Sequence, residues 1–145
     1  MIKVEQPIAL VCVFTWIGFV CAISFMEAWL KFRAPGVTLP IGLGIGRLVF
    51  SILNKVEWVF AIAIVISTLM SGTPVATWQK GLFVAVVAIL VTQTVWLLPG
   101  LDARAQEHKD GKAVAPSYLH LYYVAAELLK VTSLIIIGIN LFKRS

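Results

Sequence analysis

Four long apolar stretches, separated by short polar segments, set the pattern of this chain. Each stretch is long enough to cross the roughly 30 Å hydrocarbon layer of a bilayer as a helix. The intervening segments are rich in Gly, Pro and charged residues, which end helices and favour loops, and short connections favour antiparallel neighbours. The pattern therefore predicts an all-α fold, an integral membrane four-helix transmembrane bundle with both termini on one side. The predicted helices cover residues of about 7–31, 44–71, 77–98 and 117–142.

The composition agrees with a membrane protein that forms one domain over residues 1–145. Hydrophobic residues make up 60% of the chain and its mean hydropathy is +0.95, whereas soluble proteins contain about 45 to 50% apolar residues. The net charge of +5 comes from few charged residues, 13% of the chain, which is typical of loops lying against anionic lipid headgroups. We therefore expect the lipid bilayer as a partner and no nucleic acid, while a homo-oligomer or a larger membrane complex stays open.

The first stretch is predicted to be a transmembrane helix that is not cleaved. Residues 7–26, PIALVCVFTWIGFVCAISFM, are too long for the apolar part of a signal peptide and end without an A-x-A cleavage site. We expect a multi-pass protein of the bacterial inner membrane. A slight excess of basic residues beside the two longer loops predicts that these loops are cytoplasmic. The residues compared are Lys31, Arg33, Arg47, Arg104, Lys109 and Lys112 on that side and Lys3, Lys80, Lys143 and Arg144 on the other.

Two of the stretches carry charge inside the expected membrane boundary. In the second, the uninterrupted apolar run covers only residues 58–70, about 20 Å of helix, so crossing requires Glu57 to enter the membrane. In the fourth, the apolar run covers residues 131–142, so Glu127 and Lys130 must enter as well. An ionisable group at this depth costs about 2.5 to 3.5 kcal/mol unless it finds a partner or water. These groups are therefore predicted to converge inside the bundle.

Helical spacing sorts the polar residues by face. Arg47, Asn54 and Glu57 share one face of the second helix, whereas Lys55 points away and can reach the interface. The fourth helix has a polar face at steps of three, four and three residues, and Glu27 ends the first helix on the same membrane side. The third helix contributes the polar residues 92–94, Thr-Gln-Thr, to the same set. We predict that Glu57 or Glu27 pairs with Lys130, and that Arg47 pairs with a remaining carboxylate. The candidate ligand-binding residues are Glu27, Arg47, Asn54, Glu57, His120, Tyr123, Glu127 and Lys130.

Two interpretations of this polar set stay open. The number of charged groups exceeds what helix register requires, which predicts a water-accessible polar cavity in one half of the membrane. Such a cavity would bind or pass a small polar or amphipathic molecule, or dock a membrane partner. Alternatively, the ion pairs only fix the packing of the helices. If Glu57 and Lys130 are paired, removing either one is expected to cost more stability than removing both.

Other chemistry is not indicated. Cys12 and Cys21 lie nine residues apart on one helix and cannot bridge each other, and there is no Cys/His cluster of the kind that binds a metal. No Ser or Cys has a His at useful spacing, so no catalytic residue is assigned and no cofactor is expected. The motif IGLGIG at 41–46 is interpreted as a tight re-entry before the second helix, whose start is marked by Thr38 and Pro40.

A weak internal similarity suggests two tandem helical hairpins as a further possibility. The segment AWLKFRAPG at 28–36 leads toward Glu57, and VWLLPGLDAR at 95–104 leads toward Glu127. The separations from Trp-Leu to Glu differ by only three residues. A parallel repeat of this kind is known among membrane proteins.

Two family resemblances follow from these residues. The four-helix layout, with VWLLPGLDARAQ ending the third helix and SYLHLYYVAAELLK opening the fourth, resembles a family of small bacterial membrane proteins of unknown function, which implies the fold alone. Arg47 followed by Asn54-Lys55-Val56-Glu57 is similar to the Arg and Asn-x-x-Glu of the MAPEG family of membrane glutathione and eicosanoid enzymes. That resemblance implies trimers that bind glutathione between helices through Arg47, Asn54 and Glu57, and a glutathione-dependent enzyme as the alternative function. Phe50 stands where that family usually has a second Arg, and its late Arg-Tyr-Gly-Tyr pattern is missing.

Overall fold

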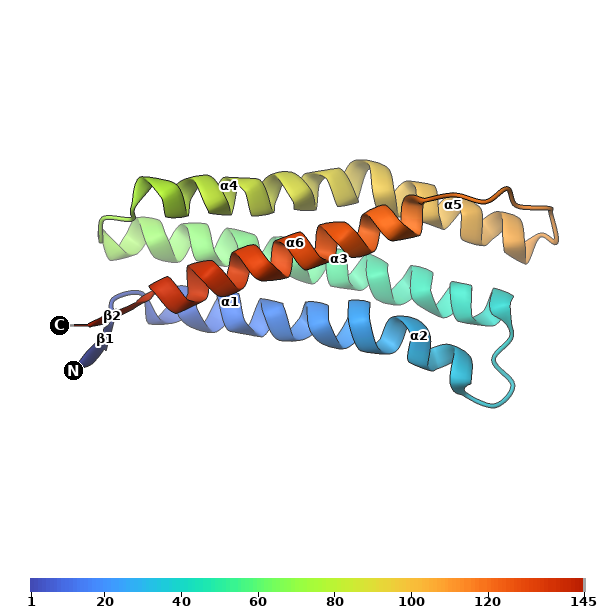
Figure 1. Ribbon diagram of the computed structural model, residues 1–145, viewed down its shortest axis with the longest axis horizontal. Helices are drawn as coiled ribbons and strands as arrows, with labels where there is room; N and C mark the ends of the chain where they lie inside the picture. Colours follow the sequence, from blue (N-terminus) through green and yellow to red (C-terminus); the bar gives the residue numbers. More distant parts are fainter. Residues whose placement is uncertain (145) are drawn as a thin grey trace.

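The structure is a computed structural model that describes residues 1–144, and it is an elongated bundle of four helical rods (Figure 1). In this part of the chain, each rod is long and apolar enough to cross a membrane. Two of the rods contain short segments of π-helix or 3-10 helix within the α-helix. In chain order the rods are α1 (Pro7–Val20), η1 (Cys21–Glu27), α2 (Ala28–Leu30) and η2 (Lys31–Arg33); α3 (Leu39–Ser71); α4 (Thr77–Thr92), η3 (Gln93–Leu97) and α5 (Leu98–Lys109); and α6 (Leu119–Asn140).

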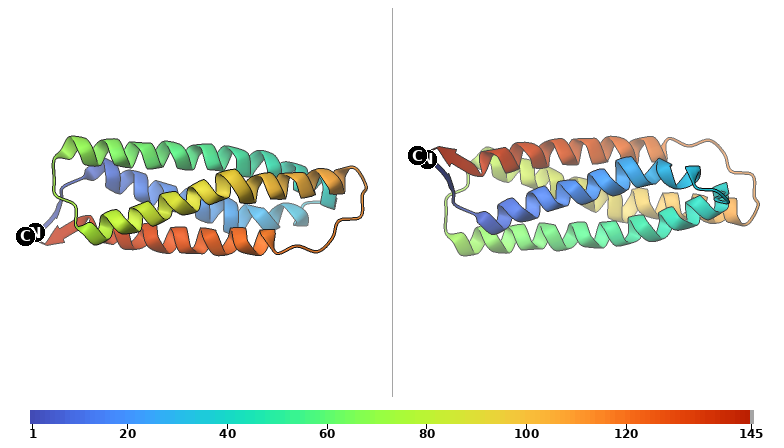
Figure 2. Two further views of the ribbon diagram at one scale, coloured as in Figure 1. Left: turned by 90° about the horizontal axis from the view of Figure 1, so that it is seen from above. Right: turned by 90° about the horizontal axis from the view of Figure 1, so that it is seen from below.

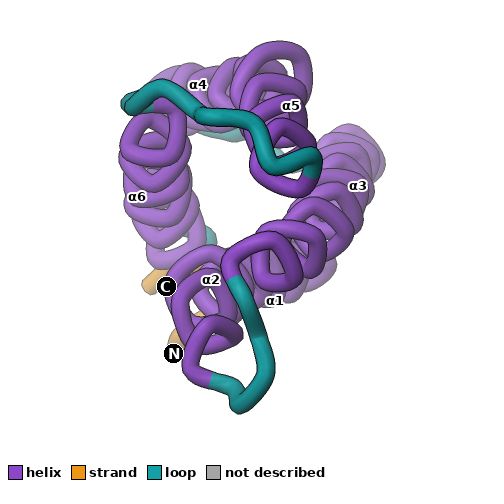
Figure 3. Tube along the Cα trace, turned by 90° about the vertical axis from the view of Figure 1, so that its right-hand side faces the viewer, coloured by secondary structure: helices purple, strands orange, loops and turns teal. Residues whose placement is uncertain are grey.

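The rods form a closed ring in which each packs against the next in the sequence, as Figure 3 shows along the bundle. The first rod contacts α3, α3 contacts α4 and α5, α4 contacts α6, and α6 returns to α1. Figure 2 shows that sequential rods run in opposite directions. The predicted antiparallel arrangement is therefore confirmed.

Both termini lie at the same end of the bundle, where they are joined by a small sheet (Figure 1). The strands β1 (Ile2–Val4) and β2 (Phe142–Arg144) pair in antiparallel register, with Val4 opposite Phe142. The all-α prediction is correct for the bundle but missed this pair. The pairing of β1 with β2 also explains why the last helix ends at Asn140 and not at the predicted residue 142, because the residues from Phe142 onward form a strand.

The second helix begins at Leu39, five residues before the predicted position. Thr38 has the extended backbone of an N-cap, and Pro40 lies in the first turn, where its missing N–H is not needed. The motif IGLGIG is helical, so its interpretation as a re-entry was wrong. Gly42 and Gly46 are buried, and a Cβ on Gly42 would lie 2.6 Å from Cδ1 and 2.8 Å from Cζ of Phe32. The glycines thus let the end of the first rod pack closely on α3.

The third rod continues to Lys109, although Pro99 predicted its end near residue 98. The π-helical segment η3 lies directly before Pro99, which takes a position in the first turn of α5. A proline cannot donate the usual helical hydrogen bond, and a π-segment already displaces that bonding pattern. The rod therefore passes through the proline, and Asp102 belongs to a helix where a loop was predicted.

The interior of the bundle is apolar toward the termini and polar further along. The apolar part includes Val13, Trp16, Leu90 and Leu134, each with no exposed surface. Large apolar side chains also cover the outside, so the surface is as hydrophobic as the core. Examples that are at least 60% exposed are Leu48, Ile52, Val59, Leu69, Val84, Val95 and Leu129.

Candidate functional site

Three charged side chains meet in the interior of the bundle, and we call Glu57, Glu127 and Lys130 the ion cluster. The Lys130 ammonium group contacts Glu57 Oε2 from α3 and lies 2.7 Å from Glu127 Oε1, one turn away on α6. All three side chains are at most 1% exposed. The predicted pairing of Glu57 with Lys130 is therefore present, and Glu127 joins it.

Neutral side chains from the other two rods complete the hydrogen bonds of the ion cluster. Trp16 Nε1 donates to Glu57 Oε2 at 2.7 Å, and Ser24 Oγ donates to Glu127 Oε2 at 3.0 Å. The Gln93 amide donates to Glu127 Oε1 and accepts from Lys130 Nζ at 2.6 Å. Lys130 thus has three acceptors for its three protons, and all four rods contribute to the network.

Trp16, Ser24 and Gln93 are not among the eight candidate ligand-binding residues, although Gln93, with Thr92 and Thr94, was expected to face the polar interior. Gln93 lies in the polar triplet 92–94 of an otherwise apolar helix, and that interruption was the available signal. Trp16 and Ser24 gave no such signal, because both are common in membrane helices. They become functional candidates only through their contacts with carboxylates of other rods.

Two π-helical segments carry donors to Glu127. Ser24 lies in η1 and Gln93 lies in η3, and each segment interrupts a longer α-helix. A π-segment widens the helix and changes which residues face inward, and such segments are frequent at functional sites. Here both direct polar side chains from apolar helices into the ion cluster.

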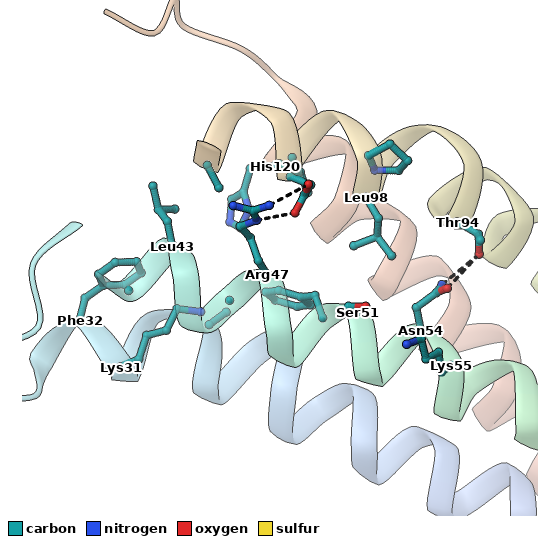
Figure 4. A pocket seen from close by; sticks show the side chains of 18 residues that line it. Lys31, Phe32, Leu43, Arg47, Ser51, Asn54, Lys55, Thr94, Leu98 and His120 are labelled. Atoms are coloured by element: carbon teal, nitrogen blue, oxygen red, sulfur yellow. Dashed lines mark hydrogen bonds and ion pairs between the residues drawn. The ribbon is translucent and has the colours of Figure 1, made fainter. Parts of the chain in front are cut away.

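A groove of about 560 Å³ lies nearer the loop end, lined by the end of the first rod, by α3, by η3 and α5, and by the start of α6. Apolar walls are provided by Phe32, Leu43, Phe50, Leu98 and Leu101, among others. Three cationic side chains and one carboxylate also line it: Lys31, Arg47, Lys55 and Asp102. Figure 4 shows Arg47 reaching toward α5 at one part of the groove and Asn54 reaching toward Thr94 at another.

Arg47 is held by α5. Its guanidinium group lies 2.5 Å and 3.1 Å from the two oxygens of Asp102, and it donates to Gln106 Oε1 at 2.6 Å. The prediction that Arg47 pairs with a remaining carboxylate of the candidate set was therefore wrong. Its partner is Asp102, which was not among the candidates because α5 was taken as a loop. This bidentate pair joins the beginning of α3 to the extension of the third rod.

The eight predicted site residues do not share one cavity. Glu57, Glu127 and Lys130 form the ion cluster, with Tyr123 buried beside them; Arg47, Asn54 and His120 line the groove instead. Glu27 lies at the end of η1 and pairs with Lys31 at 3.3 Å, with no contact to Lys130 seen in the described residues. The candidates thus separate into a closed cluster and an open groove.

A thin layer of side chains divides the groove from the ion cluster. Asn54 donates to Thr94 Oγ1 at 3.0 Å, and both residues line the groove. Phe50, also in the groove wall, contacts the Tyr123 ring edge-on at a centroid distance of 5.2 Å. Asn54 lies one turn from Glu57, and Thr94 is next to Gln93. The side chains of Asn54 and Thr94 therefore line the groove on the side that faces the ion cluster.

Comparison with known proteins adds no identity to this site. No family model, no curated protein and no solved structure matches the chain. Within residues 1–144, no group of three or more His, Cys, Asp or Glu side chains is placed to hold a metal ion.

Proposed function

We propose that this chain is a multi-pass membrane protein that binds a small amphipathic anion in the groove at the membrane surface. The observation that carries the proposal is the lining of the groove, in which apolar walls are combined with Lys31, Arg47 and Lys55 against the one carboxylate of Asp102. An apolar pocket with a few convergent polar groups is the usual form of a small-molecule site. Arg47 is paired with Asp102 and Lys31 with Glu27, so Lys55 supplies the positive charge that favours an anionic headgroup.

The distribution of side chains supports insertion in a bilayer. The outside of the rods is covered by Ile, Leu and Val, whereas Glu57, Gln93, Glu127 and Lys130 are inside. In water, apolar surface of this extent is unfavourable, while in a bilayer the same surface contacts lipid and the polar groups are satisfied within the protein.

The lengths of the rods support a position for the groove at the membrane boundary. The 22 residues of α6 extend about 33 Å, close to the thickness of the hydrocarbon layer, while the 33 residues of α3 extend about 50 Å. With the rods aligned at the end that carries the termini, α3 and α5 project past the start of α6. His120 lies at that start and lines the groove, so a ligand there can keep its chain in lipid and its headgroup in water.

Glutathione, the ligand implied by the MAPEG resemblance, is the alternative. Arg47 and Asn54 line the groove as that resemblance implies, but Glu57 lies in the ion cluster and Arg47 is engaged by Asp102. These contacts favour an amphipathic anion over glutathione in the same groove.

Binding of oleate to the purified protein in lipid nanodiscs tests the proposal. We expect oleate to raise the midpoint of thermal unfolding, and dodecyl maltoside, which has a chain but no charge, to leave it unchanged. Lys55→Gln should weaken oleate binding by about twofold to fivefold, because one exposed cation near an anion contributes up to about 1 kcal/mol. Lys109→Gln, which changes a lysine outside the groove lining, is the matched control.

Glutathione and the two variants also provide the results that contradict the proposal. Stabilisation by glutathione without an effect of oleate would favour the enzyme alternative. Equal oleate binding by Lys55→Gln, Lys109→Gln and the unchanged protein would show that oleate binds elsewhere.

A further inference from the structure

We propose that the ion cluster is a proton-binding site that holds one proton in addition to those of the Lys130 ammonium group. The proposal does not depend on what the groove binds. It rests on a count of charges in a space closed to water. Glu57 and Glu127 bring two negative charges when ionised, and Lys130 brings one positive charge.

Among the residues that the structure describes, no other charged group contacts the cluster to balance it. From the first rod it is faced by Trp16 and Ser24, and from the third by Gln93, all of which are neutral. From α6 it is faced by Tyr123 in addition to the residues of the cluster itself, and a phenol supplies no positive charge. Lys55, the nearest cation on α3, is exposed and lines the groove.

The position of the cluster makes an unbalanced charge unfavourable. Lys130 lies ten residues before the end of α6 at Asn140, about 15 Å along the helix, which is near the centre of a bilayer. An unpaired charge buried in a low-dielectric interior is strongly disfavoured and is usually neutralised by a proton. One proton from water brings the cluster to zero net charge without breaking a contact.

The contacts indicate which carboxylate takes the proton. Glu127 accepts hydrogen bonds on both oxygens, from Ser24 on Oε2 and from Gln93 and Lys130 on Oε1. The donors to Glu57, Trp16 and Lys130, both contact Oε2. A carboxylate with more donors is better stabilised in its charged form, so the proton is assigned to Glu57 Oε1.

Tyr123 lies between the groove wall and the ion cluster. The Tyr123 ring contacts Phe50 in the groove wall. Its hydroxyl lies next to Ser24, which donates to Glu127. Hydroxyl groups both donate and accept, so Tyr123 and Ser24 can act as a relay for a proton that reaches Glu127.

Infrared spectroscopy of the protein in nanodiscs at about pH 7 to 8 tests the proposal, because free glutamate is ionised well below that range, near pH 4 to 5. We expect a carbonyl band of one protonated carboxylic acid that shifts in heavy water. Glu57→Gln and Glu127→Gln should each abolish the band, since one carboxylate then balances Lys130. Lys130→Met should roughly double it, since both carboxylates then need a proton.

Two further variants are controls. The first distinguishes the ion cluster from other carboxylates, and the second distinguishes the relay from the proton-binding site. Glu27→Gln should leave the band unchanged. Tyr123→Phe should keep the band but slow its shift in heavy water, and an unchanged rate would overturn the relay. Absence of the band in the unchanged protein, or its persistence in both Glu57→Gln and Glu127→Gln, would overturn the proton site. Since the two Gln variants retain a balanced ion pair, the test stands even if Lys130→Met does not fold.

Discussion

Lys130 contacts two carboxylates at once, which makes the three residues of the ion cluster unequal. Loss of Glu57 leaves Lys130 paired with Glu127, whereas loss of Lys130 leaves two carboxylates facing each other. If two groups interacted only with each other, removing either one would cost the same free energy of unfolding. The presence of Glu127 is therefore what decides the energetics of each substitution.

We predict that Lys130→Met lowers the free energy of unfolding by about 3 to 5 kcal/mol, the usual cost of removing one partner of a buried ion pair, because both remaining carboxylates must then be neutralised by protons. Glu57→Gln should lower it by about 1 kcal/mol or less, because the amide oxygen still accepts a hydrogen bond from Trp16. Adding Glu57→Gln to Lys130→Met should restore part of the loss. Thermal unfolding in detergent measures all three, and equal losses for the two single variants would contradict this prediction.

The stability of the protein should also depend on pH in a direction set by the cluster. If the folded state holds one proton that the unfolded chain releases, the folded state binds more protons, so the free energy of unfolding falls as the pH rises above about 5. Glu57→Gln removes this proton and should flatten the dependence. Unfolding midpoints measured between about pH 5 and pH 9 test it, and a parallel dependence in the variant and the unchanged protein would exclude the effect.

At the scale of single elements, the glycines at the start of α3 determine how closely the first rod approaches. A Cβ on Gly42 would overlap the Phe32 ring, whereas a Cβ on Gly44 would meet no atom within 4 Å. Gly42→Ala should therefore displace Phe32 from the groove wall, and it should cost about 1 kcal/mol, the lower end of the range for overpacking. That low value is expected because the ring is 38% exposed and can move.

Gly44→Ala is the matched control in the same helix. It adds the same methyl group without a contact and should raise the free energy of unfolding by up to about 1 kcal/mol through helix propensity. The difference between the two variants in thermal unfolding and in oleate binding isolates the contact with Phe32. Two variants with the same stability and the same binding would show that this contact has no role.

At the scale of the molecule, the small sheet holds both termini at the same end of the bundle, and therefore on one side of the membrane that we propose it spans. β1 and β2 pair next to the ends of α1 and α6, so one labelling site reports on both. We predict from the basic residues that this side is outside the cytoplasm. A label at the C-terminal residue, Ser145, would test this orientation, but Ser145 lies outside the described residues. Lys3 is therefore the more useful position for the label.

Cysteine labelling of intact cells tests this topology in a variant without Cys12 and Cys21. Lys3→Cys should react with an impermeant reagent added from outside, and Lys112→Cys, in the loop before α6, should react only after the cells are permeabilised. The opposite result would reverse the orientation. Both sites are exposed in the structure, so failure to react reports the side of the membrane.

The sequence by itself determined the helices and their order, because a bilayer-length apolar run and its flanking Gly, Pro and charged residues are local features. The four rods and the end of α3 at Gly72, which has a left-handed backbone, follow from such signals, whereas the predicted start of this helix at residue 44 was five residues late. A pairing of Lys130 with a carboxylate of another helix also followed, since a charge at that depth requires a partner, but the sequence left Glu27 open beside Glu57.

Only the tertiary structure decided how the polar residues are divided. Helical spacing places Arg47, Asn54 and Glu57 on one face, but neighbouring rods determine that Glu57 is enclosed while Arg47 turns to Asp102. The π-segments that bring Ser24 and Gln93 to Glu127 likewise depend on contacts between rods. A sequence gives the face of each residue on its own helix, and the packing of other helices determines what that face meets.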